Sequence, residues 1–178
     1  MKRVLTTLLL LSCVTAAEVW SQARCDLMVA INNKKASQTT DAAGTNIRSG
    51  AGTASRILTT LKNDVGFRFH VTGVSGAWFH IDYYWPGEDP SYKDLSGWIY
   101  APSTFIRIDQ ENGDAADVPI YSLFAEPTKR ARKIETLRKG DVVPLVGCKG
   151  KWAQVKYGDH IGWLSEGTQC EILDGPCG

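Results

Sequence analysis

The chain has 178 residues, and its 20 lysines and arginines nearly balance its 19 aspartates and glutamates, which gives a net charge of +1. A chain so close to neutral lacks the long-range attraction for polyanions on which generic nucleic-acid and membrane-surface binders depend, so we expect neither kind of partner. Its 43% hydrophobic and 22% charged residues are typical of a globular protein rather than a disordered one.

The first 23 residues are predicted to be a secretory signal peptide. Met1-Lys2-Arg3 is a cationic start, an apolar stretch follows, and Ser21-Gln22-Ala23 places small residues where a signal peptidase recognises them. Cleavage before Arg24, which we prefer to earlier sites, leaves about 155 residues with 18 charges of each sign. We expect the mature protein to be periplasmic or secreted, with no segment long enough to span a bilayer. A lipid anchor through Cys13 is the alternative, because residues 10–13 are similar to a bacterial lipobox.

Strands are predicted in the first half of the chain from the alternation of apolar and polar residues. Over residues 67–71, apolar side chains occupy the odd positions and polar side chains, including His70, the even ones, so the two sets face opposite sides of a strand. Over residues 78–83, the same rule places Tyr83 on the face of Ile81. Short strands joined by glycine-rich turns indicate an all-β chain built from small barrels.

The segment 84–94 combines aromatic residues with prolines and carboxylates. On a loop, aromatic side chains supply contact area at little entropic cost, and acidic neighbours favour a cationic or polar ligand. Ligand binding and packing over the barrel are both open for this segment. Arg48, in a glycine-rich stretch over residues 41–53, is a further ligand candidate, with hydrogen bonds to its own loop carbonyls as the structural alternative. The candidate ligand-binding residues are Tyr83, Tyr84, Trp85, Glu88, Asp89, Tyr92 and Arg48.

Residues 108–117 are predicted to form a linker, because this part of the chain is acidic and nearly free of large apolar side chains. Further on, Gly140-Asp141 turns the chain into an apolar strand over residues 142–146, and Tyr157-Gly158-Asp159-His160 is a tight loop between two more strands. The run Lys129-Arg130-Ala131-Arg132-Lys133 is the strongest local cluster of charge. We interpret it as a solvated turn, with contact to an acidic partner as the alternative.

Four cysteines remain after signal cleavage, which are Cys25, Cys148, Cys170 and Cys177. An even number in an oxidising compartment indicates two disulfides, for which three pairings are possible. We favour a bond between Cys148 and Cys170, because they bracket one compact hairpin region; Cys25 then pairs with Cys177 and ties the chain ends together. A zinc site or thiol nucleophile is the alternative, but the chain has no Cys-x-x-Cys motif and its three histidines lie apart, so we expect no metal and no cofactor.

Two parts of the sequence match each other. The matching segments are residues 57–62 with 134–139, 76–81 with 150–155, and 97–99 with 162–164. The offset falls from 74 at Trp78 and Trp152 to 65 at Trp98 and Trp163, so the first copy carries nine extra residues between these strands. A duplicated β unit of about 60 residues follows.

This pattern resembles the bacterial SH3 (SH3b) family in tandem copies, over about residues 40–105 and 117–170. Asn46-Ile47-Arg48-Ser49-Gly50 is similar to the opening run of that family, and the Trp strand and the Gly-Trp strand follow in the family's order. The second copy departs at its start, because residues 118–122 lack the opening run.

The resemblance implies two small, SH3-like, partly open β-barrels in tandem, reinforced by disulfides. The first domain is expected over residues 24–107, with the insert at 84–94, and the second over residues 118–178. Core packing is favoured over ligand contact for the tryptophans of the two Gly-Trp pairs. The tryptophans with expected structural roles are Trp78, Trp98, Trp152 and Trp163.

No catalytic arrangement is predicted. Asp159-His160 and Ser165 are residue types of a hydrolytic triad, but nothing resembles a nucleophile elbow. The resemblance implies an exported, non-catalytic binding module that recognises cell-wall peptidoglycan or its peptides. The alternative is a protein-binding inhibitor or immunity-type partner of a periplasmic enzyme or toxin, acting through the aromatic and acidic insert. The expected partner is therefore a peptidoglycan peptide or an envelope protein.

Overall fold

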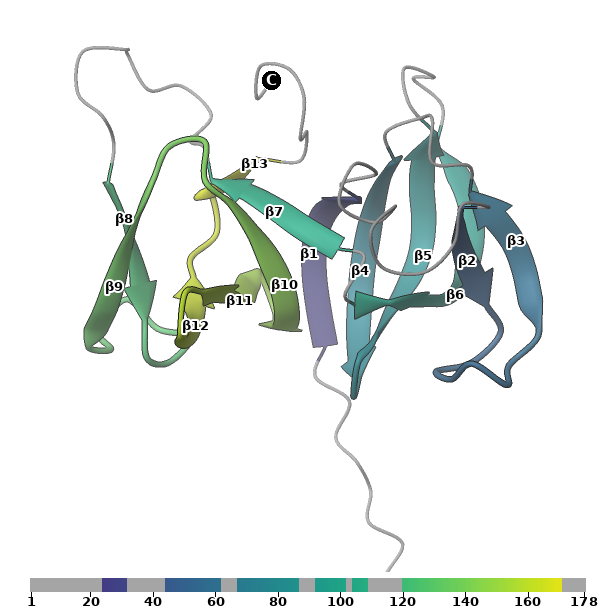
Figure 1. Cartoon of the computed structure of the whole chain (residues 1–178), viewed down its shortest axis with the longest axis horizontal. Coiled ribbons are helices and arrows are strands. Elements are labelled where there is room, and N and C mark those ends of the chain that lie inside the picture. The colour runs from purple at the N-terminus through teal and green to yellow at the C-terminus, as the bar shows by residue number, and fades with distance from the viewer. Residues whose placement is uncertain are drawn as a thin grey trace, which may run out of the picture.

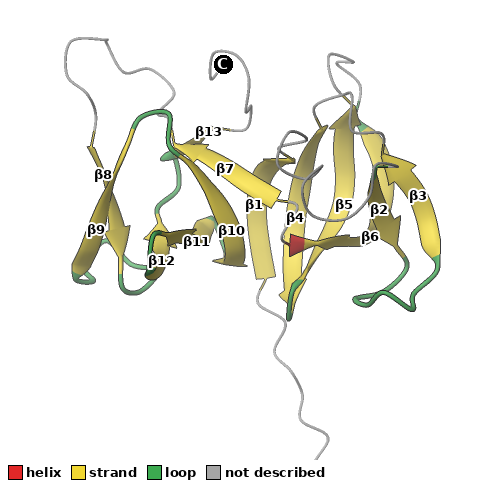
Figure 2. Cartoon of the chain, in the orientation of Figure 1, coloured by secondary structure: helices red, strands yellow, loops and turns green. Residues whose placement is uncertain are grey.

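The structure is a computed structural model, and it describes residues 24–31, 44–61, 67–86, 92–101, 104–108 and 120–170. Strands account for most of these residues (Figure 2), so the predicted all-β class is confirmed. In these ranges no helix has the length and apolar character needed to cross a membrane. The predicted signal peptide, linker residues 109–117, Glu88, Asp89 and Cys177 lie outside the described residues. In chain order the strands are β1 (Arg24–Ile31), β2 (Thr45–Arg48), β3 (Ile57–Leu61), β4 (Phe67–Ser75), β5 (Trp78–Pro86), β6 (Lys93–Tyr100), β7 (Thr104–Ile108), β8 (Ile120–Phe124), β9 (Lys133–Arg138), β10 (Val142–Lys149), β11 (Trp152–Tyr157), β12 (His160–Leu164) and β13 (Gln169–Cys170).

The strands form two lobes that lie side by side (Figure 1). The first lobe holds β1 to β6, hydrogen-bonded in the order β3-β2-β6-β5-β4-β1, and the second holds β7 to β13, in the order β9-β8-β12-β11-β10-β7 with β13 also on β7. Counted from its own first strand, each lobe has the same strand order. The end strands β3 and β9 do not pair with the opposite ends of their sheets, so the SH3-like barrels are open, as expected. The predicted domain boundary at residues 107 and 108 falls within β7.

Irregularities of strand register also recur at matching places in the two lobes. In the first lobe the pairing of β2 with β3 shifts between Ile47 and Arg48, and in the second lobe the pairing of β8 with β9 shifts between Leu123 and Phe124. The register between β4 and β5 shifts after Val71, and the register between β10 and β11 shifts after Leu145. A β-bulge bends and twists its strand, so the same local geometry shapes both sheets.

The hydrophobic core is continuous through both lobes. In β4 burial alternates residue by residue, with Phe67, Phe69 and Val71 buried and the residues between them partly exposed, which confirms the predicted faces. In the second lobe, Leu145 of β10 and Val155 of β11 are buried in the same way. Because side chains of a strand alternate between its faces, each sheet buries one face and presents the other to solvent.

The N-terminal strand β1 joins the lobes. It pairs antiparallel with β4 along most of its length and with β7 at its C-terminal end. Near its start, the backbone N–H of Asp26 donates to the carbonyl oxygen of Gly150 at 2.9 Å, and the N–H of Gly150 donates to that of Arg24 at 2.7 Å. The strand therefore belongs to the first sheet and also touches the turn between β10 and β11 of the second lobe.

A disulfide between Cys25 and Cys148 reinforces this junction and corrects the predicted pairing. The two residues are 123 positions apart in the chain, and their Cα atoms lie 5.6 Å apart. The favoured bond between Cys148 and Cys170 is therefore wrong, and so is its companion between Cys25 and Cys177. The hairpin argument failed because Cys170 lies in β13 opposite Arg107 of β7, whereas the end of β10 that carries Cys148 lies beside β1.

Candidate functional site

A bulge in β5 at Asp82 turns Tyr83 toward the outer face of the sheet. The register pairs Val71 with Ile81 and His70 with Tyr83, so Asp82 is an extra residue on β5. In such a bulge two residues of one strand oppose one residue of its partner, which shifts the alternation of side chains by one position. Ile81 is fully buried, whereas Asp82 and Tyr83 both contact the ring of His70 on the outer face. The prediction that Tyr83 shares the face of Ile81 is therefore wrong.

His70 joins three strands through its ring. Nδ1 lies 2.7 Å from Oδ1 of Asp82 on β5, and Nε2 lies 3.1 Å from Oδ1 of Asp26 on β1. Partial burial lowers the pKa of His70, but the hydrogen bonds and charges of the two aspartates together outweigh it and raise the net pKa above the usual 6.5. When the ring is protonated, both nitrogens donate to carboxylates, and the imidazolium ties β1 to β4 and β5. We call His70, Asp26 and Asp82 the His70 clamp.

Three aromatic rings extend from the His70 clamp. Tyr83 stacks on the ring of His70, with centroids 4.7 Å apart and planes 16° apart. Trp85 meets Tyr83 edge-on at 4.9 Å, and Tyr92 lies 5.6 Å from Tyr83 and 6.1 Å from Trp85. Arg68, the cross-strand partner of Trp85, places its guanidinium 5.3 Å from the centroid of that ring, within the range of a cation–π interaction. We call Tyr83, Trp85 and Tyr92 the aromatic surface.

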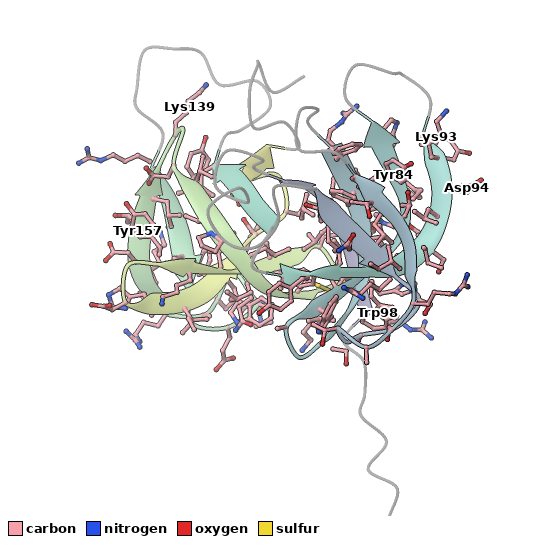
Figure 3. The ribbon with its side chains drawn as sticks, turned by 45° about the vertical axis from the view of Figure 1, so that its right-hand side comes forward. Tyr84, Lys93, Asp94, Trp98, Lys139 and Tyr157 are labelled. Atoms are coloured by element: carbon pink, nitrogen blue, oxygen red, sulfur yellow. A yellow bond between two sulfur atoms is a disulfide. The ribbon has the colours of Figure 1, made fainter. Side chains whose placement is uncertain are left out.

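Tyr84, another predicted ligand residue, does not join the aromatic surface. Its ring lies 6.0 Å from Phe67 and 6.3 Å from Phe69, against the core. Figure 3 places Tyr84 at the same end of the first lobe as Lys93 and Asp94, with Trp98 at the other end. The structure therefore brings together three of the four aromatic candidates and sends the fourth inward.

Arg48 holds its own loop together. Its Nη1 donates to the carbonyl oxygens of Thr53 and Ser55, each at 2.8 Å, across the turn between β2 and β3. On the strand side, Arg48 pairs with Trp98, near the end of β6 remote from Tyr92. These contacts are the structural role that the sequence left open for Arg48, and they separate it from the aromatic surface.

The Gly-Trp pairs place glycine rather than tryptophan in the core. In β6, Gly97 and Ile99 are buried and Trp98 between them is half-buried on the outer face, with its ring edge-on to a neighbouring histidine. Gly162 and Trp163 repeat this arrangement in β12. Strand alternation gives the inward positions to the neighbours of the two tryptophans, which lie half-buried on the outer face.

The other two tryptophans with predicted structural roles begin β5 and β11. Trp78 contacts Tyr100 with ring centroids 5.2 Å apart, and Trp152 meets Phe124 edge-on at 5.8 Å. Tyr100 is 41% exposed, at the end of β6 opposite to the aromatic surface. Tyr100 is therefore an exposed aromatic residue of the first lobe that lies outside the candidate site.

The basic run lies in the turn between β8 and β9. The backbone N–H of Ala125 donates to the carbonyl oxygen of Arg132 at 2.9 Å, which closes the turn. The four cationic side chains of the basic run are exposed, as a solvated turn requires. They lie in the second lobe and make no part of the aromatic surface.

The remaining histidines show no triad. His80 lies between two hydroxyls, with Nδ1 2.7 Å from Oγ1 of Thr72 and Nε2 3.1 Å from Oγ of Ser96. A catalytic serine and histidine pair needs a carboxylate to orient the imidazole, and here a hydroxyl occupies that place. His160 lies 3.8 Å from Glu135 at the surface. Within the described part of the chain, no group of three or more His, Cys, Asp or Glu side chains is placed to hold a metal ion.

The sequence did not identify Asp26, Arg68, His70 and Asp82 as neighbours of the aromatic residues. The alternation over residues 67–71 placed Arg68 and His70 outward, which was the available signal. The missing information was the register between β4 and β5 and the position of β1, both of which depend on pairing between distant strands.

Comparison with known proteins identifies one part of the chain. Residues 121–168 match the bacterial SH3 domain family. No curated protein matches the chain. The matched residues lie within the second lobe, which therefore contains a bacterial SH3 domain, in agreement with this part of the sequence resemblance.

Proposed function

We propose that this protein is an exported, non-catalytic binding module that recognises cell-wall peptidoglycan or its peptides. The observation that carries the proposal is the bacterial SH3 domain at residues 121–168, because domains of this family are generally binding modules and commonly bind cell-wall components. The disulfide between Cys25 and Cys148 supports a periplasmic or extracellular location, since such bonds persist in oxidising compartments. The predicted signal peptide would deliver the chain there.

We further propose that the first lobe is a divergent copy of the same domain. The shared strand order and the recurring register irregularities support this, and the two Gly-Trp glycines add an atomic match. A Cβ atom on Gly97 would lie 2.5 Å from Ile47 of β2 and 3.2 Å from Leu58 of β3. On Gly162, the distances to Leu123 of β8 and to the facing side chain of β9 would be 2.6 and 2.7 Å. In both lobes the strands approach so closely that only a hydrogen fits at this position.

Sedimentation with purified, insoluble peptidoglycan tests the binding function. The mature protein is expected in the pellet, while an unrelated neutral protein of similar size stays in the supernatant. Equal distribution of the two proteins would overturn the proposal. Chromatography of the supernatant tests the non-catalytic part, because release of soluble wall fragments above the level of a protein-free control would contradict it.

A protein partner is the second candidate, and the exposure of Tyr92 favours it. This side chain is 56% exposed, and tyrosine and tryptophan are enriched among the residues that dominate binding energy at protein interfaces. Affinity capture from periplasmic extract is expected to retain one stoichiometric protein, and the Tyr92→Ala variant is expected to lose it. Deleting the whole insert is a poorer test, because Tyr84 packs against the core.

A further inference from the structure

The His70 clamp, Arg68 and the aromatic surface form one site on the outer face of the first lobe. We propose that this site binds a neutral, hydroxyl-rich carbohydrate chain. The inference rests on the function proposed above and assigns the glycan, rather than the peptide, to the first lobe.

The ring geometry suits a sugar better than a flat ligand. The planes of the three rings differ by 86° between Tyr83 and Trp85, 56° between Tyr83 and Tyr92, and 64° between Trp85 and Tyr92. The rings therefore line a corner and offer no common platform on which a planar heterocycle stacks. A pyranose ring carries C–H groups on its faces and hydroxyls around its rim, so its faces pack on aromatic rings while its rim stays polar.

Hydrogen-bonding groups for that rim surround the rings. Among the described residues each clamp aspartate bonds through Oδ1, which leaves Oδ2 of Asp26 and of Asp82 as acceptors on side chains that are 60% and 43% exposed. Arg68 adds guanidinium N–H donors beside Trp85. Carboxylates and guanidiniums present paired acceptors and donors, which is the geometry that neighbouring hydroxyls of a sugar satisfy.

The balance of charge favours a neutral ligand over an ionic one. Charges of both signs surround the rings, since the carboxylates of Asp26 and Asp82 lie against the ring of His70 and the guanidinium of Arg68 lies at Trp85. On β6, Lys93 and Asp94 are adjacent and opposite in sign, and both are exposed. A cationic or anionic ligand would therefore meet charges of its own sign at this site, whereas hydroxyls pair with charges of either sign.

The position of the site within the sheet argues against a peptide that binds as an added strand. An added strand binds through the unpaired backbone of an edge, whereas β5 pairs with β4 on one side and with β6 on the other. The aromatic surface therefore recognises its ligand through side chains alone, which suits a saccharide.

Two probes test the inference. The first is insoluble chitin, a neutral polymer of N-acetylglucosamine that carries no peptide, and the second is a soluble oligomer of N-acetylglucosamine, followed by tryptophan fluorescence and calorimetry. The mature protein is expected to sediment with chitin and to bind the oligomer. Tyr92→Ala and Trp85→Ala are each expected to weaken binding about tenfold or more. The matched control Tyr100→Ala, at the far end of β6, is expected to stay within about twofold.

The outcomes separate this inference from the proposed function. Retention on intact peptidoglycan with none on chitin would leave the proposed function standing and overturn the carbohydrate site. Loss of retention on both materials would remove the proposed function as well. Undiminished glycan binding by a Tyr92→Ala variant with unchanged circular dichroism would overturn the placement of the site. Because Tyr92 is exposed, its truncation leaves no cavity in the core.

Discussion

Removing the disulfide between Cys25 and Cys148 is expected to lower the free energy of unfolding by about 5 kcal/mol. The bond closes a loop across 123 positions, and the chain-entropy model assigns about 5 kcal/mol to a loop of that length. In the reduced state β1 keeps its backbone pairing with β4 and β7, so the loss comes mainly from the greater freedom of the unfolded chain. Because native proteins are commonly stable by only about 5 to 15 kcal/mol, such a loss is a large fraction of the total.

Urea unfolding of a Cys25→Ala/Cys148→Ala double variant, beside the oxidised parent protein, measures this loss. Alanine is preferred to serine because both positions are buried and a serine hydroxyl there would need a hydrogen-bond partner. A Cys170→Ala/Cys177→Ala variant is the matched control: a bond between these two would close only a short loop, for which the same model gives about 2 kcal/mol. The reasoning would be refuted if the Cys25/Cys148 variant lost less than about 1 kcal/mol, or if the control variant lost more than the Cys25/Cys148 variant.

Two further predictions concern packing in the second lobe and the His70 clamp. Gly162→Ala is expected to lower the free energy of unfolding by about 1 to 3 kcal/mol, because its Cβ would lie 2.6 Å from Leu123. The control Gly52→Ala, whose Cβ would meet only Ser55 at 3.9 Å, should change that free energy by less than about 0.5 kcal/mol. Similar urea midpoints for the two variants would contradict this prediction. Because the folded pKa of His70 is raised, its stabilisation is fully present below the unfolded value of 6.5 and is lost as the pH rises through the folded value. The difference in unfolding free energy between the parent protein and His70→Gln should therefore shrink from about pH 6 to about pH 8, and a constant difference would disprove the clamp's link to protonation.

Alternation predicted the faces of β4 correctly, because any regular strand with one buried side has a period of two. The same rule failed at Tyr83, where the single extra residue Asp82 reversed the face of the residues that follow. Insertions of one residue leave the composition of a segment almost unchanged, so pattern analysis does not locate them. The bulge is nevertheless what brings Tyr83 onto the ring of His70 and exposes the candidate site.

The Gly-Trp pairs show a different limit. Their repetition located two equivalent strands, and the buried glycines at Gly97 and Gly162 explain why the residue type is needed there. Which residue of each pair faces the core depends on the register with the neighbouring strands, and in both lobes it is the glycine.

The near-neutral composition, the all-β class and the bacterial SH3 pattern of the second lobe followed from the sequence by itself, because composition, alternation and motif spacing are local properties of the chain. Only the tertiary structure decided that Cys25 meets Cys148 and that His70 meets Asp26 and Asp82. Both arrangements depend on β1, which reaches its place through hydrogen bonds and burial against strands far along the chain. No local pattern specifies such a partner, because the free energy that selects it arises only when the two lobes fold together.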